Sequence, residues 1–393
     1  MELLAGPRHK ECELNISTRT VVNQIRKLWR EDEGAAIAFV AVCMLALLGT
    51  AALAVDVGML MNARTEAQRV ADLAALAGAG VLATQPTNAT LAELEAISFA
   101  AQNNVNGSAA VVQSQDVDVD VVNGLVRVRV ERSSARGNPV QTFFAQAFGV
   151  HTVDVGAEGA AQVFGATGAS CLLPVALPDR WANFGSAEWD PAGEGDSYVP
   201  PGQPGHTGYT DADIGTQIVL KPSQGGTNQG QNASLIGRFE PGWWYLWIPN
   251  GGAGSSLVRD HITGCPDNTL THNQGDWVTD KNGNMQAVVN DFQDLIDQDP
   301  YASYDPVCNC VTGGMGMSSP RIRGIPIFDP TTYSHNGSNS NFQIASFAGV
   351  FVEYVSHGPN GQKLVYARIM GFSGTDPSAG NTSSLAKTVR LVE

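Results

Sequence analysis

One long uncharged segment near the N-terminus dominates the hydrophobic pattern of the chain. Residues 34–55 contain no Asp, Glu, Lys or Arg. As a helix this run extends about 33 Å, at about 1.5 Å per residue, which is enough to cross the hydrocarbon core of a bilayer. The pattern therefore predicts a single transmembrane helix, with most of the chain on one side of the membrane.

A second helical pattern follows without a break. Residues 56–84 are rich in alanine and contain no proline, so we expect the transmembrane helix to continue into an extracytoplasmic helix. Small residues recur every fourth position in both parts, and such ridges let helix backbones approach closely. We take them as candidates for association with a partner, a second copy or the chain's own head. The candidates are Ala38, Ala46, Thr50 and Ala54 in the first ridge and Ala63, Ala67, Ala71, Ala75 and Ala79 in the second.

Basic residues indicate the direction of the span. The cations before it are Arg8, Lys10, Arg19, Arg26, Lys27 and Arg30, and the first one after it is Arg64. Since Lys and Arg favour the cytoplasmic side, we expect residues 1–33 inside and 56–393 outside. The alternative is a signal peptide cleaved after Ala52-Leu53-Ala54, but the apolar run exceeds the usual core of about 7–15 residues. The length favours an uncleaved anchor.

Residues 85–165 alternate between helical and strand patterns. Gln85-Pro86 ends the long helix, and a capping box at 90–93 opens a second helix that reaches about residue 104. A short helix at 139–148 is predicted to bury its three phenylalanines, and a strand at 153–163 follows. This order suits a small sheet packed on helices.

A hairpin over residues 116–130 gives the clearest strand signal. Asn123-Gly124 is typical of a two-residue turn. That turn would place Asp120 opposite Arg127 and Asp118 opposite Arg129. The other face would then consist of valines, which specifies the register strongly.

The remainder of the chain reads as mainly β with one helix. Expected strands are 216–221, 243–248, 342–354, 363–372 and 386–392, and the expected helix is 288–296. The predicted fold class is α+β, with a single N-terminal transmembrane helix that extends into a small α+β domain, followed by a disulfide-braced, mainly-β domain. The expected divisions are 1–33 (cytoplasmic basic segment), 34–55 (transmembrane helix), 56–84 (Ala-rich extracytoplasmic helix), 85–165 (small α+β domain) and 166–393 (mainly-β domain).

Charge and cysteine usage narrow the class of protein. The net charge of −15 argues against nucleic-acid binding, which requires a basic patch. Cys12 and Cys43 precede or lie within the span and are expected as free thiols, whereas the extracytoplasmic cysteines are disulfide candidates. These candidates are Cys171, Cys265, Cys308 and Cys310.

The pairing of those four cysteines has more than one solution. A Cys308–Cys310 bond would close a very small ring, so we expect Cys171 and Cys265 each to bond one member of that pair. A zinc site that also uses His261 is the alternative, although zinc-binding cysteines are usually spaced by about two to four residues.

Motifs for catalysis are missing from the sequence. It contains no H-E-x-x-H, P-loop, Gly-x-Gly-x-x-Gly or Gly-x-Ser-x-Gly. We therefore predict no enzymatic activity, no catalytic residue, no cofactor and no metal. Asp211 and Asp213 provide only two carboxylates, which is few for calcium.

The aromatic run at 243–247 has two interpretations. Trp243, Tyr245 and Trp247 would share one face of a strand and could form an exposed platform for a glycan or a partner. Alternatively, the strand is buried on both faces.

The order of motifs around the span is distinctive. Glu33-Gly34 precedes the apolar run, Asp56 and Gly58 follow it, and Asp72 lies in the string A-D-L-A-A-L-A-G-A. This order resembles the N-terminal region of the TadE/TadG-like proteins of the Tad (Flp-type) pilus system. The likeness continues at 139–149, and it gives Gly34, Asp56, Gly58 and Asp72 as family-motif residues.

Two features of that family are not carried over. Pseudopilin-like members have Glu at the fifth residue after the processing glycine, where this chain has Phe39. Some TadG-like members contain a von Willebrand A domain with a D-x-S-x-S metal site, a motif that this sequence lacks. The resemblance therefore implies neither pilin-type cleavage nor metal-dependent adhesion.

The resemblance implies a membrane-anchored, extracytoplasmic assembly or accessory protein of a Tad pilus system that acts as a scaffold. The expected location is the bacterial inner (cytoplasmic) membrane, with a single pass, a cytoplasmic N-terminus and a periplasmic or extracellular C-terminal bulk. Expected partners are the membrane, other pilus-assembly or envelope proteins and a second copy through the transmembrane helix. The alternatives are a membrane-tethered adhesin or glycan-binding module, and an anchored hydrolase.

Overall fold

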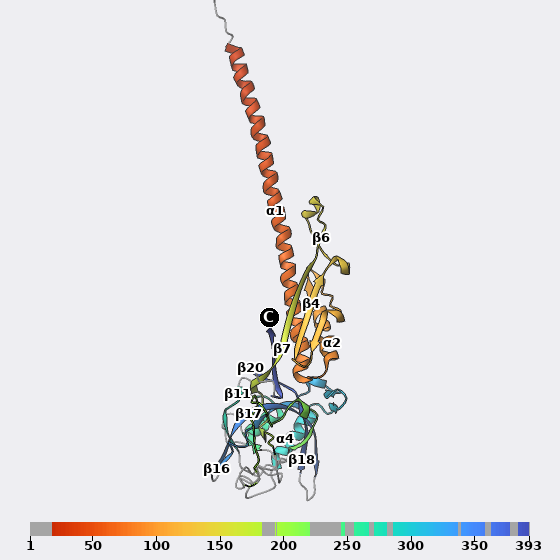
Figure 1. Ribbon diagram of the computed structural model, residues 1–393, viewed down its shortest axis with the longest axis vertical. Helices are drawn as coiled ribbons and strands as arrows, with labels where there is room; N and C mark the ends of the chain where they lie inside the picture. The colour runs from red at the N-terminus through yellow and green to blue at the C-terminus, as the bar shows by residue number, and fades with distance from the viewer. Residues whose placement is uncertain are drawn as a thin grey trace, which may run out of the picture.

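A long helix carries a small helix–sheet unit, and a larger β unit lies at the far end of the molecule (Figure 1). This computed structural model describes residues 18–182, 193, 195–220, 245–247, 255–266, 271–280, 286–336, 339–357, 363–377 and 384–392. The expected fold class is confirmed: an apolar N-terminal helix is followed by mixed helices and sheets with two bonded cysteine pairs.

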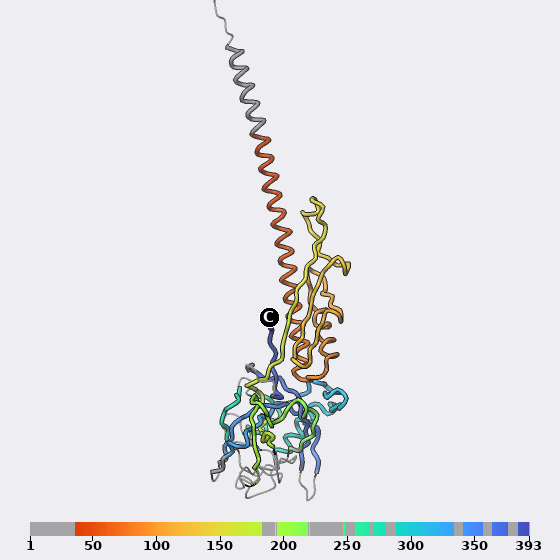
Figure 2. Tube along the Cα trace, viewed as in Figure 1, coloured from red at the N-terminus to blue at the C-terminus, as the bar shows by residue number. Residues whose placement is uncertain are grey.

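The long helix α1 (Thr18–Thr84) continues for 67 residues. Its segment Ala36–Thr84 is long and apolar enough to cross a membrane. None of the 18 residues in its most apolar stretch is buried. Large side chains such as Phe39 and Leu45 are each 70% exposed. The N-terminal portion of this segment, up to residue 55, stands clear of the other described elements (Figure 2). Exposed apolar surface of this extent is typical of a region that contacts a membrane or a partner.

The C-terminal half of α1 packs on a second helix and a twisted sheet. The sheet has the order β19-β21-β7-β4-β3, with β11 and β20 also paired to β7. The elements are α2 (Ala89–Ala101), β3 (Val117–Asp120), β4 (Leu125–Arg132), β7 (Val155–Ser170), β11 (Thr271–Asn273), β19 (Phe372–Ser373), β20 (Thr375–Pro377) and β21 (Ala386–Val392), with the short pairs β1 (Asn104–Val105) and β2 (Ser108–Ala109), and β5 (Val140–Gln141) and β6 (Thr152–Val153). Alanines of the helices and valines of the sheet form the shared core.

The β3–β4 hairpin has a different register from the one expected. Asp118 lies opposite Arg127 and Asp120 opposite Leu125, so the loop holds four residues instead of two. The Asp120 carboxylate accepts hydrogen bonds from the backbone N–H groups of Val122 and Asn123, at 3.0 and 3.1 Å, and so stabilises the longer loop. Because the shift is two residues, the valines keep their face, and Val126 and Val128 are buried as expected.

The segment 139–148 does not bury its phenylalanines. It forms strand β5 and a single 3₁₀ turn, η3 (Ala145–Phe148). Phe143, Phe144 and Phe148 are 70%, 49% and 82% exposed. The expected short helix was wrong because this segment extends beyond the edge of the core, where no described element covers it (Figure 1).

The larger unit is built on a second sheet. Its order is β10-β8-β15-β17-β18-β9, and β12 and β16 also pair with β17. The elements are β8 (Val175–Pro178), β9 (Gln217–Leu220), β10 (Tyr245–Leu246), β12 (Trp277–Asp280), β15 (Ile322–Phe328), β16 (Ser334–Asn336), β17 (Asn339–His357) and β18 (Lys363–Met370), with helices α3 (Ser255–Thr263) and α4 (Gln286–Asp297) and the separate hairpin β13 (Ser303–Asp305) and β14 (Cys310–Thr312). Both helices contribute to the core beneath this sheet.

Helix α4 buries the residues that its periodicity selected, including Phe292 and Leu295, which have no exposed surface. Helix α3 was not expected, since the Gly-rich sequence before it reads as a turn. Val258 and Ile262, one helical turn apart, pack against α4 and the sheet.

The two units share strands. The boundary expected at residue 165 falls within β7, and β21, the last strand, pairs with β7 from Lys387–Gly165 to Val392–Ala160. The chain therefore returns from the larger unit to complete the smaller sheet. The domain division stays a prediction, with β7 and β21 common to both parts.

The expected disulfide pairing was wrong. Cys171 bonds Cys265, with 5.3 Å between their Cα atoms, and Cys308 bonds Cys310, with 5.1 Å. Cys308 and Cys310 lie at the turn of the β13–β14 hairpin, where Asn309 has a positive φ of 51°. The chain reversal at that residue brings the two cysteines together and makes the small ring feasible.

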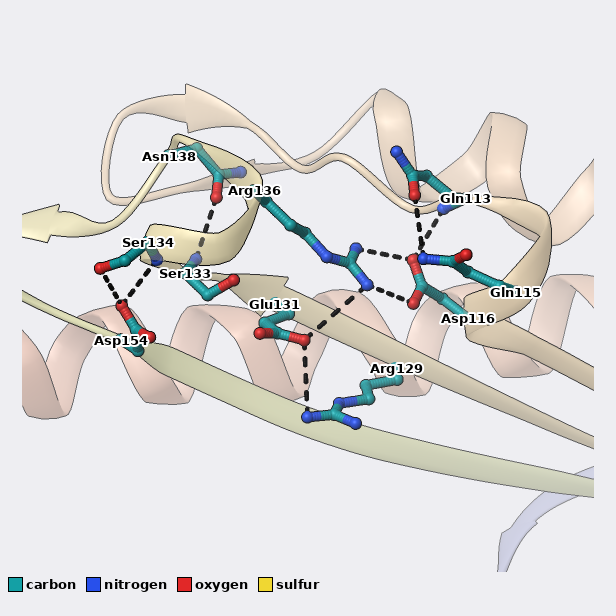
Figure 3. Close-up of polar contacts among 10 residues, drawn as sticks. All are labelled: Gln113, Gln115, Asp116, Arg129, Glu131, Ser133, Ser134, Arg136, Asn138 and Asp154. Carbon is teal, nitrogen blue, oxygen red and sulfur yellow. Dashed lines mark hydrogen bonds and ion pairs between the residues drawn. The ribbon is translucent and has the colours of Figure 1, made fainter.

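A polar cluster closes the end of the small sheet (Figure 3). The guanidinium of Arg136 donates to both carboxylate oxygens of Asp116, at 2.7 and 2.5 Å. It also lies 3.7 Å from Glu131, which in turn lies 3.4 Å from Arg129. The backbone N–H of Gln113 donates to Asp116 as well. The cluster thus ties the loop before β3 to the loop after β4.

This cluster predicts a pH dependence of stability. Burial alone would raise the pKa of Asp116, but its hydrogen bonds with Arg136 and Gln113 hold that pKa below the ordinary value of 3.8. A carboxylate with a lowered native pKa stabilises the fold above its unfolded pKa, and this contribution is lost as pH falls through the native pKa. We expect Asp116→Asn to lower Tm by about 2–4 °C or more at neutral pH, and the difference from wild type to shrink near pH 3. The measurement is thermal unfolding in detergent. A Tm difference between variant and wild type that stays constant from neutral pH to pH 3 would contradict this explanation.

Candidate functional site

The candidate site is the stretch of α1 where the helix leaves its exposed apolar part and meets the small sheet. It begins at Asp56 and runs to Ala79. Figure 2 shows α1 continuing through this junction without a bend that would separate the two parts. The site is a structural junction, where the head is hydrogen-bonded to the helix and packs against it.

Asp56 forms the first part of the junction. Its side chain is buried, with 2% exposure, although the residues around it on α1 are largely exposed. Its carboxylate accepts hydrogen bonds from the backbone N–H groups of Phe143, Phe144 and Ala145, at 2.9, 3.0 and 2.6 Å. One helix residue therefore holds a hairpin about 90 positions later in the chain, and charge-assisted bonds of this kind are the stronger ones.

The second alanine ridge forms the next part. Ala63, Ala67, Ala71, Ala75 and Ala79 are all at most 1% exposed, and they pack against the small sheet or α2. The ridge thus associates with the chain's own head, which was one of its expected roles. It is covered, so it is not a surface for a second copy.

Gly159 shows how closely β7 approaches the helix. A Cβ atom at this position would lie 2.5 Å from the backbone nitrogen of Asp72 and 2.6 Å from the carbonyl carbon of Ala71. Only glycine fits such a distance. The side-chain amide of Gln68 fixes the same crossing, since it donates to the Glu158 carbonyl and to the Asp72 carboxylate, both at 2.8 Å.

The other motif residues have different environments. Gly58 is exposed, and a Cβ there would meet no atom within 4 Å. Gly34 lies in α1, outside the residues whose side chains are described. In the first ridge, Ala38, Ala46, Thr50 and Ala54 are exposed, and no contact in the structure tests their association with a partner.

A groove runs along the outer side of the junction. Its volume is about 680 Å³, and it lies between α1 and the end of β21. The lining residues include Arg64, Arg69, Leu73, Leu76 and Leu391. Among the described strands, residues 388–392 of β21 pair only with β7, so the other edge of this segment is open beside the groove.

The aromatic run contributes less to a surface than its platform interpretation requires. Trp247 is 1% exposed and packs edge-on against His272, with ring centroids 4.8 Å apart. It therefore belongs to the core, which contradicts its assignment as a binding residue. Tyr245 lies in β10, but its side chain is outside the described part, as is all of Trp243.

The acidic pair considered for calcium is engaged in ion pairs. Asp213 lies 2.5 Å from Arg180, and Asp211 lies 3.2 Å from Lys387. Within the described ranges, no group of three or more His, Cys, Asp and Glu side chains is arranged to hold a metal ion. These carboxylates pair with cations of the fold.

The sequence did not predict a buried polar cluster around Asp179. Asp179 has no exposed surface and accepts hydrogen bonds at 2.9 Å from the Tyr198 hydroxyl and the Tyr209 backbone N–H. Burial, with the Asp179 charge, raises the pKa of Tyr198, so its hydroxyl remains a donor. The partners come from a loop about 20 to 30 residues later, a separation that no motif in the sequence signals. The cluster joins this loop to the end of β8.

The Asp56 bonds give a testable local effect. Replacing Asp56 with Ala removes the acceptor of three backbone N–H groups, so we expect amide exchange at residues 143–145 to accelerate by about tenfold or more. Asp56→Asn keeps one acceptor oxygen and should show a smaller effect. Hydrogen exchange followed by mass spectrometry provides the measurement. Unchanged exchange in the Ala variant would show that the three bonds do not hold the hairpin.

Comparisons with known proteins give one match, which covers the helical side of the junction. Residues 34–81 match the family described as "Putative Flp pilus-assembly TadE/G-like". No curated protein and no solved structure matches the chain. The matched segment contains the apolar span and ends within the alanine-rich part of α1, so it covers Asp56 and Asp72. Together with a helix able to cross a membrane, the match indicates a membrane-anchored, Tad pilus-associated protein. The expected resemblance is thus confirmed over residues 34–81, which match the TadE/G-like family model.

Proposed function

We propose that this protein is a scaffold of a Tad (Flp-type) pilus system, which holds an extracytoplasmic head at a fixed position above the membrane. The observation that carries the proposal is the continuity of α1. One helix contains both the apolar span and the alanine ridge that is buried in the head. Because the Asp56 and Gln68 bonds also tie the head to this helix, a force on the head would be transmitted to the membrane anchor.

The proposed location is the bacterial inner membrane, with residues 1–33 in the cytoplasm and the head in the periplasm or outside the cell. The excess of Lys and Arg before the span supports this orientation.

The orientation can be tested with the native Cys12, which lies outside the described residues. In a Cys43→Ser variant, we expect a membrane-impermeant maleimide to label Cys12 only after spheroplasts are lysed. A cysteine at position 122, in a chain without Cys12 and Cys43, is the control and should react in intact spheroplasts, since Val122 is 89% exposed on the head. Labelling of Cys12 in intact spheroplasts would show that the N-terminus lies outside the cytoplasm, which contradicts the proposed orientation.

We place the contact with other pilus or envelope proteins on the groove beside β21. A strand edge with unpaired backbone groups can accept a strand from a partner, and Leu391 offers an apolar side chain that is 46% exposed. Self-association through the first alanine ridge is a further part of the proposal, since that ridge is exposed along the span. We propose no catalytic role.

Adhesion is the less favoured function. Its support was the aromatic platform, and the burial of Trp247 removes one of the three side chains from that surface.

A gene deletion tests the proposed function. We expect the deletion strain to lose surface pili, as counted by electron microscopy, and the full chain to restore them. Leu391→Glu should restore fewer pili than Val122→Glu, a matched change at an exposed residue away from the groove. Normal piliation in the deletion strain would refute an essential role in assembly, whereas equal restoration by both variants would refute the groove as the contact surface.

A further inference from the structure

The tip of the β5–β6 hairpin, defined here as residues 142–150, presents an apolar surface that no described element covers. Phe143, Phe148 and Val150 are 70%, 82% and 46% exposed, and Phe144 is 49% exposed. A water-facing hairpin gains nothing from three exposed phenylalanines. Such patches mark surfaces that contact a partner or a membrane.

The position of the tip identifies what it contacts. The Asp56 carboxylate bonds the backbone of Phe143 and its two successors, and Asp56 directly follows the uncharged run 34–55. Val140 and Val155, at the base of the hairpin, pack against Met59 and Leu60 of the same helix. The tip therefore lies beside α1 at the end of the predicted span, and Figure 1 shows the hairpin around β6 pointing along α1 toward its N-terminus.

The composition of the hairpin suits a lipid environment. Residues 137–153 contain no Asp, Glu, Lys or Arg. Exposed helix residues such as Leu53 and Val55, at 60% and 53%, continue the apolar surface from the tip onto the span. A charged loop at this depth would be excluded from the bilayer, whereas phenylalanine partitions favourably into its boundary region.

The backbone of the tip also meets the requirement for leaving water. Unsatisfied N–H and C=O groups are costly in an apolar medium. Here the Thr142 N–H donates to the His151 carbonyl, the Val150 N–H to the Ala145 carbonyl and the Thr142 hydroxyl to the Val150 carbonyl. The Gln146 side-chain amide donates to the Thr142 carbonyl. Asp56 binds three further N–H groups. Many of the backbone N–H and C=O groups of the turn are therefore hydrogen-bonded within the protein and do not need water.

We propose that this tip inserts into the boundary between headgroups and acyl chains of the same bilayer that α1 crosses. The inference rests on the anchoring part of the proposed function. The protein would then touch the membrane at two places, the span and the tip. Two contacts fix the tilt and the rotation of the head, which a single helix cannot do.

The test uses the full chain with its disulfides intact, in vesicles of phosphatidylethanolamine and phosphatidylglycerol. A nitrobenzoxadiazole probe is attached to a single free cysteine at one of three positions: native Cys43, Phe148→Cys or Val122→Cys. The other free cysteines are replaced by serine. Val122 is the matched control, because it is 89% exposed and lies at the end of β4 opposite the tip, given that Leu125 pairs with Gln162 and Arg132 with Val155.

We expect a blue-shifted emission and quenching by spin-labelled lipids at positions 43 and 148, and neither effect at position 122. If position 43 is quenched and position 148 behaves like position 122, the tip does not insert, and the anchor stands. If neither position 43 nor position 148 is quenched, α1 is not in the bilayer, and both the anchor and the insertion are refuted. Quenching at all three positions would indicate general adsorption of the head and would also refute the proposal.

Discussion

Replacing Gly159 with alanine is expected to destabilise the head strongly, although the added group is a single methyl. The new Cβ would lie 2.5 and 2.6 Å from backbone atoms of Asp72 and Ala71. Backbone atoms of a helix cannot rotate away as a side chain can, so β7 must shift from α1 or the helix must bend. Overpacking of this kind costs about 1–3 kcal/mol or more.

Gly156 in the same strand supplies the matched control. It lies on the other face of β7, where a Cβ would be 3.4 Å from the Val130 carbonyl oxygen, an ordinary contact. We expect Gly156→Ala to change the stability by no more than about 0.5 kcal/mol in either direction. Thermal unfolding of both variants in detergent provides the comparison. Equal Tm values for the two would mean that β7 does not pack on α1 as closely as described.

Removing the Cys171–Cys265 bond is expected to have the second large effect. The two cysteines are 94 positions apart, so the bond closes a long loop and restricts the unfolded chain strongly. The loop-closure relation gives about 4–5 kcal/mol for this bond, and measured losses are typically about 2–5 kcal/mol. The Cys308–Cys310 bond spans a separation of 2, for which the same relation gives only roughly 1–2 kcal/mol.

The double variants Cys171→Ser/Cys265→Ser and Cys308→Ser/Cys310→Ser test this difference. We expect the first to unfold at a clearly lower denaturant concentration than the second. Non-reducing peptide mapping of the wild-type protein checks the pairing itself. Peptides that join Cys171 or Cys265 to the Cys308–Cys310 segment would contradict the structure and support the pairing that the sequence suggested.

Local patterns predicted α1, α2, α4 and several strands well, because these elements depend on short-range periodicity. The uncharged run, the alanine spacing and the apolar face of α4 each specify an element without information from the rest of the chain. The β3–β4 hairpin shows what local patterns do not predict. Alternation predicted which valines face the core, but the loop length depended on Asp120 bonding backbone N–H groups, and the register moved by two.

Other errors concern the exposure or burial of residues whose surroundings are set by distant segments. Phe143 and its neighbours look like core residues in the sequence, and only their place beyond the sheet edge makes them exposed. Helix α3 is the reverse case: it was not expected, and packing partners elsewhere in the chain bury its Val258 and Ile262. The disulfide pairing required knowing that the chain reverses at Asn309.

The sequence predicted some residues of the candidate site but not their contacts. The family motif singled out Asp56 and Asp72, but it did not reveal that Asp56 holds the 143–145 backbone or that Asp72 lies beneath Gly159. These partners are roughly 90 positions away. No local signal gives such a pairing. Gly159 offered a clue, because a glycine within a strand often marks a close backbone approach, but it is one of four glycines in β7.

The central claim is that the head functions only while α1 holds it on the membrane. The most direct test is a pilus count in a deletion strain that expresses either of two variants. In one, residues 34–55 are replaced by an unrelated apolar span of equal length, and in the other a cleavable signal peptide releases residues 56–393. Formation of the Cys171–Cys265 disulfide verifies that the released head folds. We predict that the anchored variant restores pili and the released head does not. Restoration by the released head would contradict the claim.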